Sequence, residues 1–357
     1  MNNKTKDISE MKRFFFDQNT TRQFIQFLMN KAKLIAPHRK GEKSFSFQET
    51  TDPDQVVLNY NRTIQPLKKF FLPPMETLFR FETNGKPKIK KTEIKVEERI
   101  FLGIHSYDMK AIQLLDYSFD HENPEENYFL RREKSIFIGI AYEPDEYHFA
   151  EDLGIDVYDT TGFALFMAPA EKGFLVFEVD EKGHELLREF GKGLPLDAEL
   201  QYERPQAKKK LKMHHNRLPQ IFSHVYDSPV WKKVAERCLG CGTCNLVCST
   251  CYCFDVFDEV ELNVTEGERK RTWDSCMLNP FAQVAGGEDF RSGLDSRTRH
   301  RLYRKFKYLT DRSGELHCIG CGRCSYFCPA KISLVEVIND LIEDYNRQQQ
   351  GVSVAMS

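Results

Sequence analysis

The sequence is dominated by two stretches, CLGCGTCNLVC at residues 238–248 and CIGCGRCSYFC at residues 318–328. Both space their cysteines as C-x2-C-x2-C-x3-C, and Pro329 follows the second stretch. This spacing is typical of proteins with two 4Fe–4S clusters, in which the fourth cysteine of each run binds the cluster of the other run. The sequence therefore predicts two iron–sulfur clusters.

The crossed pattern assigns four cysteines to each cluster, three from one run and one from the other. The predicted ligands of the first cluster are Cys238, Cys241, Cys244 and Cys328. The predicted ligands of the second cluster are Cys318, Cys321, Cys324 and Cys248.

Two other uses of these cysteines fit the spacing less well. Zinc sites usually combine two separate C-x2–4-C knuckles, whereas each run here adds a third cysteine directly after its knuckle. Disulfides are disfavoured because the 11 cysteines are odd in number and the N-terminus, MNNKTKDISEMKR, lacks the apolar stretch of a secretory signal. A zinc-stabilised binding module remains the alternative.

Composition limits the classes of protein to which the chain can belong. Its 357 residues suggest about two domains, and its net charge of −2 gives no sign of a surface built for nucleic acid or lipid. No apolar run reaches the roughly 18 residues that a membrane span needs. We expect a cytoplasmic protein without a membrane span, in a reducing compartment where thiolates are available to iron.

Cysteine usage divides the chain. The first 237 residues contain no cysteine, and all 11 lie between Cys238 and Cys328. We therefore expect an α+β protein in which an N-terminal α/β domain precedes an α-helical, ferredoxin-like dicluster domain. The predicted parts are the N-terminal domain at residues 1–202, a charged linker at 203–226, the dicluster domain at 227–345 and a flexible tail at 346–357.

The N-terminal part alternates helical and strand patterns. Apolar spacing predicts a helix over residues 20–36, and the short apolar run RIFLGI at 99–104 predicts a buried strand. A helix over 109–119, with Asp108 as its N-cap, and a strand over 135–141 are predicted next. Strand, helix and strand in this order indicate a right-handed βαβ unit.

A hairpin and another helix are predicted further along. The hairpin pairs residues 163–167 with 174–179 through the loop APAEKG. The helix covers 180–190, and Gly191 is suited to end it.

Helices are also predicted on the outer sides of the two cysteine runs, over residues 229–237 and 332–345. Cys248 and Cys318 are 70 residues apart in the sequence. A helical ferredoxin arrangement therefore fits better than the compact ββαββα form.

Three further cysteines, Cys251, Cys253 and Cys276, lie outside the two runs. Together with one outside ligand they are suited to a third metal centre, because thiolates are the usual ligands of iron–sulfur clusters. The alternative is that they are small buried side chains, or thiols that shield the clusters. Both interpretations stay open.

Residues 297–308, RTRHRLYRKFKY, form a strongly basic stretch with interleaved aromatic side chains. Such a stretch is compatible with nucleic-acid binding, but the rest of the chain is not basic. We expect no nucleic-acid partner, and instead a helix whose exposed basic face lies near the clusters and offsets their negative charge or docks an acidic partner. Arg237, next to the first run, and Arg323, within the second, are expected to help tune the cluster potentials.

Motifs for substrate chemistry are missing from the sequence. It contains no P-loop, no G-x-G-x-x-G after a strand, no G-x-S-x-G and no H-E-x-x-H. The sequence therefore shows no evident active site of its own and no evident site for NAD(P)H or flavin. The predicted work of the chain is the transfer of single electrons.

Four C-terminal segments carry a resemblance to a known family. They are CLGCGTCNLVCSTCYCFDV from Cys238, RTWDSCM from Arg271, VAGG-x-x-FR from Val284 and CIGCGRCSYFCP from Cys318. Together they resemble the iron–sulfur electron-transfer subunit of anaerobic sulfite reductase and, equally, the β subunit of soluble NiFe sulfhydrogenases. LPPMETLFRF and GIHSYDMKAIQLLDYSF extend the resemblance into the N-terminal half, over most of residues 65–340.

The resemblance implies an electron-transfer component of a hetero-oligomeric anaerobic oxidoreductase. Such a component relays electrons from or to a subunit that binds FAD and NAD(P)H, and it exchanges them with a catalytic subunit of the sulfite reductase or NiFe hydrogenase type. A related alternative is the electron carrier of a flavin oxidoreductase linked to heterodisulfide reductase. Cys251, Cys253 and Cys276 match the family pattern, so the resemblance also implies that they have a role.

The chain departs from the family in its N-terminal half. Where members often carry cysteines, this sequence has Tyr107, His148 and Ala150. The resemblance therefore implies that any N-terminal metal site of those relatives is absent here. This also argues against a third centre that draws its ligands from both halves.

Overall fold

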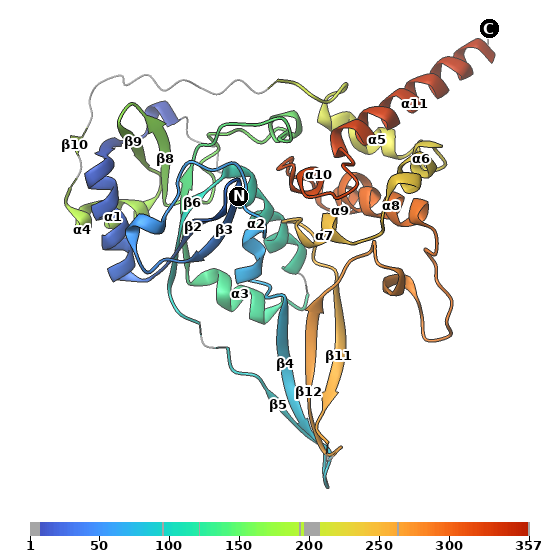
Figure 1. Ribbon diagram of the computed structural model, residues 1–357, viewed down its shortest axis with the longest axis horizontal. Helices are drawn as coiled ribbons and strands as arrows, with labels where there is room; N and C mark the ends of the chain where they lie inside the picture. Colours follow the sequence, from blue (N-terminus) through green and yellow to red (C-terminus); the bar gives the residue numbers. More distant parts are fainter. Residues whose placement is uncertain are drawn as a thin grey trace.

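The structure is a computed structural model that describes residues 8–94, 96–120, 122–192, 194–195, 208–262 and 264–355. Its strands form two sheets, one of eight strands and one of four. Figure 1 shows the larger sheet and its helices on one side, a helical region with the C-terminus on the other, and the smaller sheet projecting below. No helix in the described part of the chain is both long enough and apolar enough to cross a membrane.

The eight-stranded sheet lies in the N-terminal half and has the order β10-β1-β9-β8-β7-β6-β2-β3. Its strands are β1 (Arg13–Asp17), β2 (Lys33–Gly41), β3 (Ser44–Glu49), β6 (Arg99–Ile104), β7 (Ser135–Ile140), β8 (Leu165–Ala170), β9 (Gly173–Glu178) and β10 (Leu194–Pro195). The central strands β2, β6, β7 and β8 run parallel, and the remaining pairings are antiparallel.

Both faces of this sheet are covered by apolar side chains. Its helices are α1 (Gln18–Lys31), α2 (Ser106–Phe119), α3 (Glu126–Glu133) and α4 (Glu181–Phe190). Successive side chains of a strand point to opposite faces. Ile100 and Leu102 of β6 accordingly join the core cluster of Phe24 in α1, whereas Phe101 joins that of Ile112 in α2. Burial on both faces explains why residues 100–104 of β6, IFLGI, are apolar throughout instead of alternating.

The predicted strand at 99–104 is confirmed as β6. The parallel strands of the predicted βαβ unit are also confirmed, because β6 and β7 run parallel with Ile100 opposite Ile136. Helices α2 and α3 lie between these two strands in the sequence.

The predicted hairpin and the helix after it are confirmed, with one difference in the turn. β8 continues to Ala170 and β9 begins at Gly173, so the turn has two residues instead of six. Asp180 is the N-cap of α4, and its carboxylate accepts a hydrogen bond from the Gly183 N–H at 2.9 Å. Gly191 ends the helix with a φ of 61°.

Two N-terminal predictions need correction. The helix predicted over 20–36 is confirmed as α1, but it begins at Gln18 and already ends at Lys31, because the buried residues that follow form β2 between β6 and β3. Asp108 is not the N-cap of α2. His105 has that position, and Asp108 lies in the first turn with a fully buried side chain.

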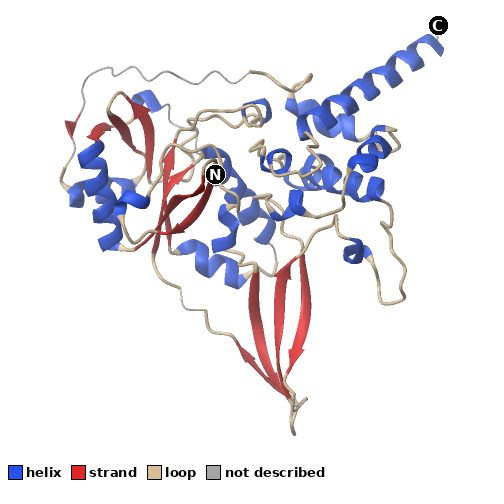
Figure 2. Ribbon diagram, in the orientation of Figure 1, coloured by secondary structure: helices blue, strands red, loops and turns tan. Residues whose placement is uncertain are grey.

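The four-stranded sheet, which we call the arm, combines strands from both halves of the chain. Its antiparallel order is β11 (Phe254–Val260), β12 (Glu266–Trp273), β4 (Met75–Glu82) and β5 (Lys88–Lys91). Figure 2 shows the arm as a narrow group of strands that extends away from the helices. Strands of both predicted domains therefore share one sheet, and the C-terminal part is not entirely helical.

Helices surround the two cysteine runs. They are α5 (Leu218–Phe222), α6 (Val230–Arg237), α7 (Thr243–Leu246), α8 (Leu294–Tyr303), α9 (Leu309–Ser313), α10 (Arg323–Tyr326) and α11 (Leu334–Ala355), and a π-helical segment, Arg304–Tyr308, joins α8 to α9. Short 3-10 helices lie at Ile8–Glu10, Pro53–Gln55, Leu67–Phe70, Glu151–Leu153, His215–Arg217 and Asn279–Ala282. Trp231 of α6, Phe306 and Ile338 of α11 belong to one core cluster, which holds these helices together.

The helices predicted beside the cysteine runs are confirmed as α6 and α11. α11 continues to Ala355, so the predicted tail is helical over 346–355, and residues 356–357 lie outside the described residues.

The predicted linker also has structure. Its residues 203–207 lie outside the described residues, but α5 follows with Leu218 and Ile221 buried in the core. This segment is therefore partly core and not only a charged connector.

Candidate iron–sulfur site

Two loops with the same backbone carry most of the predicted ligands. We call residues 238–244 the first loop and residues 318–324 the second loop. In the first, Gly240 and Gly242 have φ values of 62° and 74°, and in the second, Gly320 and Gly322 have values of 63° and 70°. Glycine adopts positive φ readily whereas other residues are strained there. The paired glycines therefore turn both loops in the same way before the short helices α7 and α10 begin.

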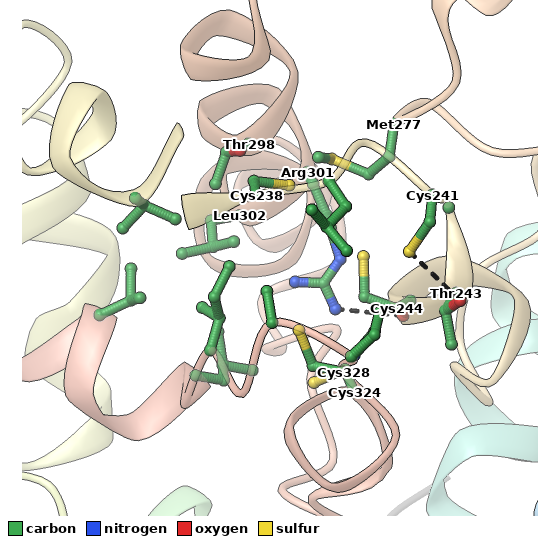
Figure 3. A pocket seen from close by; sticks show the side chains of 18 residues that line it. Cys238, Cys241, Thr243, Cys244, Met277, Thr298, Arg301, Leu302, Cys324 and Cys328 are labelled. Atoms are coloured by element: carbon green, nitrogen blue, oxygen red, sulfur yellow. Dashed lines mark hydrogen bonds between the residues drawn. The ribbon is translucent and has the colours of Figure 1, made fainter. Parts of the chain in front are cut away.

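The cysteines predicted for the first cluster lie around one cavity. Its lining includes Cys238, Cys241, Cys244 and Cys328, together with Cys324, Leu239, Met277 and Arg301. Figure 3 shows the four predicted ligands grouped around this cavity. The fold thus brings a cysteine of the second run to the three cysteines of the first loop. That these four bind iron stays a prediction.

The cysteines predicted for the second cluster are also neighbours. Burial raises the pKa of the Cys318 thiol, and the nearby sulfurs of Cys324, Cys248 and Cys321 raise it further. Cys321 itself is only 8% exposed. Because Cys324 also lines the first cavity, the two candidate cluster sites are adjacent.

Four buried cations surround these cysteines: Lys68, Arg301, Lys305 and Arg323. Their exposed fractions are 3%, 8%, 5% and 0%, respectively. Of these four, Arg323 alone has a carboxylate partner among the described residues, and that partner is Asp108. A buried charge without a counter-charge costs several kcal/mol. The site therefore needs negative charge, which thiolates bound to a cluster provide.

The three cations without a carboxylate partner make hydrogen bonds close to the cysteines. Arg301 donates to the Cys244 carbonyl at 3.2 Å, and Lys305 donates to Thr250 Oγ1 at 2.6 Å. Lys68, from the N-terminal half, donates to the carbonyl of Cys251. All three thus face the backbone or side chains of the segment between Cys244 and Cys251.

The cysteines act on the pKa values of these cations. Burial lowers the pKa of Arg301, but the sulfurs of Cys244 and Cys324 outweigh this and raise it above its usual value. In the same way, Cys248 and Cys251 raise the pKa of Lys305 despite its burial. Both side chains therefore stay charged next to the thiolates.

The prediction of an exposed basic face over 297–308 was wrong for three of its residues. Arg297, Arg301 and Lys305 are at most 8% exposed. Arg301 and Lys305 point to the cysteines, and Arg297 donates to the Met277 carbonyl at 3.3 Å. The basic pattern was visible in the sequence, but its direction depends on how α8 packs.

The second loop is fixed to the N-terminal half by a buried ion pair. Arg323 Nη2 lies 2.6 Å from Asp108 Oδ2, and both side chains are fully buried. Arg323 Nε also donates to the Thr63 carbonyl at 2.9 Å, and the Ser249 hydroxyl donates to Asp108 at 3.0 Å. The ion-pair role of Asp108 was not visible in the sequence, because an acidic residue before a helix resembles an N-cap.

The three candidate third-centre cysteines take part in two thiol pairs, one of which includes Cys248, a predicted ligand of the second cluster. Cys251 lies beside Cys248, whereas Cys253 lies beside Cys276, whose hydrogen bond lowers the pKa of Cys253 to about 6. Asn245 contacts both pairs, since its amide donates to Cys276 Sγ at 3.0 Å and its oxygen accepts from Cys251 Sγ at 3.6 Å.

Among the described residues, no three or more Cys, His, Asp or Glu side chains are arranged to hold a single metal ion. A cluster is wider than one ion, and its thiolates stand further apart. The third metal centre stays a prediction.

The residues at which the sequence departs from the family pattern, Tyr107, His148 and Ala150, are buried beside the second loop. Tyr107 donates its hydroxyl hydrogen to the Asn61 carbonyl at 2.6 Å, and Arg62 Nη2 lies 3.1 Å from His148 Nδ1. Burial lowers the pKa of His148 to about 4, so its imidazole is neutral at neutral pH. Packed, hydrogen-bonded side chains therefore fill this region.

Comparison with known proteins agrees with the cysteine geometry. Residues 237–332 match the family described as a 4Fe-4S dicluster domain. Over 331 residues the chain is 37% identical to the sulfhydrogenase 2 subunit beta of Pyrococcus furiosus, and the alignment covers 90% of this chain and 96% of that protein. No solved structure matches the chain. Identity at this level over nearly the whole of both proteins confirms the predicted resemblance: the chain belongs to the sulfhydrogenase beta-subunit family.

Proposed function

We propose that this chain is the iron–sulfur electron-transfer subunit of a multisubunit oxidoreductase, and that it holds two 4Fe–4S clusters in a helical ferredoxin-like frame. The observation that carries the proposal is the cavity where Cys328 of the second run meets Cys238, Cys241 and Cys244 of the first. Crossed ligation of this kind belongs to two-cluster ferredoxins.

We further propose that its partners are a flavin subunit that binds NAD(P)H and a catalytic subunit of the sulfite reductase or NiFe hydrogenase type. The support is the relative, whose name describes it as the beta subunit of a sulfhydrogenase. A protein of this kind needs no substrate site, because its work is to receive and pass on electrons.

When bound, a 4Fe–4S cluster supplies reversible one-electron chemistry. The contribution of the chain is to hold the thiolates and to offset their negative charge. Lys68, Arg301 and Lys305 are buried next to the cysteines, so their charge is little screened by water. The Gly240 N–H adds a hydrogen bond to Cys238 Sγ at 3.4 Å. Both effects favour the reduced state and raise the potential.

The first test is the cofactor content of the full chain, purified without oxygen. We expect about eight iron and eight sulfide per chain and the absorbance of thiolate-bound iron. A colourless protein that contains zinc would overturn the proposal in favour of the zinc-stabilised module.

Crossed ligation can be tested with two double variants. Cys238→Ser with Cys328→Ser removes two ligands of the same cluster, so about half of the iron should remain. Cys318→Ser with Cys328→Ser removes one ligand from each cluster, so both should be impaired. If instead the second pair spares half of the iron and the first pair does not, each run binds its own cluster.

Partners are tested by anaerobic affinity purification from the native cell. Recovery of a flavoprotein together with a sirohaem or NiFe subunit would support the relay and name the reaction. Recovery of the chain without any redox subunit, under conditions that preserve its clusters, would contradict the proposed complex.

A further inference from the structure

The first and second loops share their backbone but differ in what covers them. Leu239 and Ile319 occupy the same position in the two motifs, yet Leu239 is 68% exposed and Ile319 is 2% exposed. The same contrast holds for the next cysteine, because Cys241 is exposed whereas Cys321 is buried. One candidate cluster site therefore reaches the surface through its loop, and the other does not.

Segments of the N-terminal half cover the second loop. The Phe149 N–H donates to the Gly320 carbonyl at 2.8 Å. A Cβ atom added at Gly322 would lie 2.5 Å from the Tyr147 carbonyl oxygen, so these backbones are in direct contact. Arg62 extends this cover by donating to the Cys321 carbonyl at 3.3 Å.

The first loop has cover only on its inner side. A Cβ at Gly240 would lie 3.0 Å from the Leu294 side chain, and one at Gly242 would lie 3.2 Å from Leu278. On the outer side, the described residues leave the Leu239 side chain and Cys241 open to solvent. The second loop shows how a loop of this type is covered when protein packs on it, and the first loop has no such segment among the described residues of its own chain.

Positive charge borders the exposed side chains. Arg237 lies two residues before Leu239, and its Nη2 donates to the Lys331 carbonyl at 3.3 Å. Both Arg237 and Lys331 are exposed, and within the described residues neither takes part in an ion pair. Glu236 is the exposed acidic neighbour on α6. This edge is therefore suited to face carboxylates of another protein.

We propose that the first loop is the docking surface for a protein electron carrier that covers Leu239 and Cys241 with apolar side chains and faces Arg237 and Lys331 with acidic ones. This inference rests on the proposed function, since it needs a cluster beneath the loop. The rate of electron transfer falls steeply with distance, so a partner gains most by contacting the exposed loop. Cover by the N-terminal half keeps partners away from the second loop.

The test uses the full chain with its clusters and, as the probe, a reduced, acidic two-cluster 4Fe–4S ferredoxin. Stopped-flow absorbance follows electron transfer from the probe without oxygen. Leu239→Asp places a negative charge on the apolar contact and should slow the transfer at least about tenfold. Ile89→Asp is the matched control, because Ile89 is 71% exposed on the arm, and it should have no effect.

Charge is tested separately with Arg237→Glu and Lys331→Glu. Each should slow transfer from the acidic ferredoxin and weaken its dependence on salt, because long-range attraction sets the encounter rate. Reduction by pre-reduced methyl viologen, a small cationic electron donor, should not become slower in Lys331→Glu, because Lys331 is exposed and the donor carries positive charge. Leu239→Ser serves as a milder second variant if Leu239→Asp loses iron.

The outcomes separate the two proposals. If the wild-type chain contains no iron–sulfur clusters, the proposed function fails. If it contains them and both Leu239 variants and both charge variants accept electrons from the ferredoxin at the wild-type rate, the docking surface is wrong while the proposed function stands.

Discussion

The two cysteine loops are nearly identical in sequence and backbone, but one residue gives them different surroundings. The residue after the second glycine is Thr243 in the first loop and Arg323 in the second. Thr243 stays local, with its hydroxyl 3.4 Å from Cys241 Sγ. Arg323 reaches across to Asp108, a residue 215 positions away in the sequence. The shared residues thus determine the shape of each loop, and the variable ones determine what packs on it.

Among the changes considered, removal of the Asp108 carboxylate should most strongly disturb the packing of the N-terminal half on the second loop. Asp108→Ala leaves the fully buried Arg323 without a counter-charge, which should lower the free energy of unfolding by about 3–5 kcal/mol. Anaerobic guanidinium unfolding measures the change. We expect the second cluster to be lost more readily than the first, as followed by iron content and electron paramagnetic resonance.

The control for this variant is Asp54→Ala. It breaks the ion pair with Arg22, in which the Arg22 and Asp54 side chains are 56% and 63% exposed, and should leave the free energy of unfolding nearly unchanged because water screens the pair. Equal losses in the two variants would show that the Arg323 pair does not lock the second loop.

A matched pair of glycine substitutions separates backbone strain from packing. Gly240 and Gly320 have φ values of 62° and 63°, so alanine should cost about 1–2 kcal/mol of strain at either position. At Gly320 the added Cβ would also lie 2.4 Å from the Ala150 backbone nitrogen, whereas at Gly240 it meets the flexible Leu294 side chain. We expect Gly320→Ala to lose a further ~1–3 kcal/mol in unfolding experiments. If the two variants lose the same free energy of unfolding, the Ala150 backbone moves away from the added Cβ at little cost.

The charge of the buried Lys305 should raise the reduction potential of the second cluster more than that of the first. Lys305→Met removes a charge that acts mainly on Cys248 and Cys251, with a smaller influence on Cys318. At an effective dielectric constant near 20, the potential of the second cluster should fall by on the order of 100 mV.

A redox titration followed by electron paramagnetic resonance measures this shift. The control is Lys307→Met, because Lys307 is partly exposed and already paired with Asp311. If the two variants give the same potentials, the buried charge does not tune the site.

Protonation of His148 in acid should destabilise the segment that covers the second loop, with a smaller effect than the substitutions above. Burial lowers the pKa of His148 to about 4, below the value near 6.5 of an unfolded histidine. Between these pH values the unfolded chain binds a proton at His148 that the folded chain does not. The free energy of unfolding is therefore not reduced by His148 above pH 6.5, and it falls as the pH decreases from 6.5 toward 4. At pH 5 the loss should be about 2 kcal/mol relative to pH 7. His148→Gln should flatten the pH dependence of the unfolding midpoint, and an unchanged slope would exclude His148 as its source.

Local patterns in the sequence predicted the parts of the fold that depend on local chemistry. The spacing of the cysteines predicted which side chains gather around the first cavity, and apolar runs predicted β6, β7 and the hairpin. Asp180 and Gly191 marked both ends of α4 because capping involves only neighbouring residues.

Features that depend on distant contacts could not be predicted in this way. The pairing of Asp108 with Arg323 and the inward direction of Lys305 follow from how the two halves pack. All seven residues of β11 are exposed, so the strand lacks the alternation of buried and exposed side chains that reveals most strands. β11 forms because it pairs with β12, and the arm forms because β12 also pairs with β4.

The arm has a consequence for the synthesis of the protein. Met75 of β4 pairs with Thr272 of β12, which lies 197 residues later in the chain (272 − 75). At an elongation rate of about 5–20 residues per second, β4 waits roughly 10–40 seconds for its partner to leave the ribosome. During that time one edge of β4 is open to pairing with other chains. The arm therefore closes late in translation, and a chain that ends before β12 leaves β4 without its native neighbour.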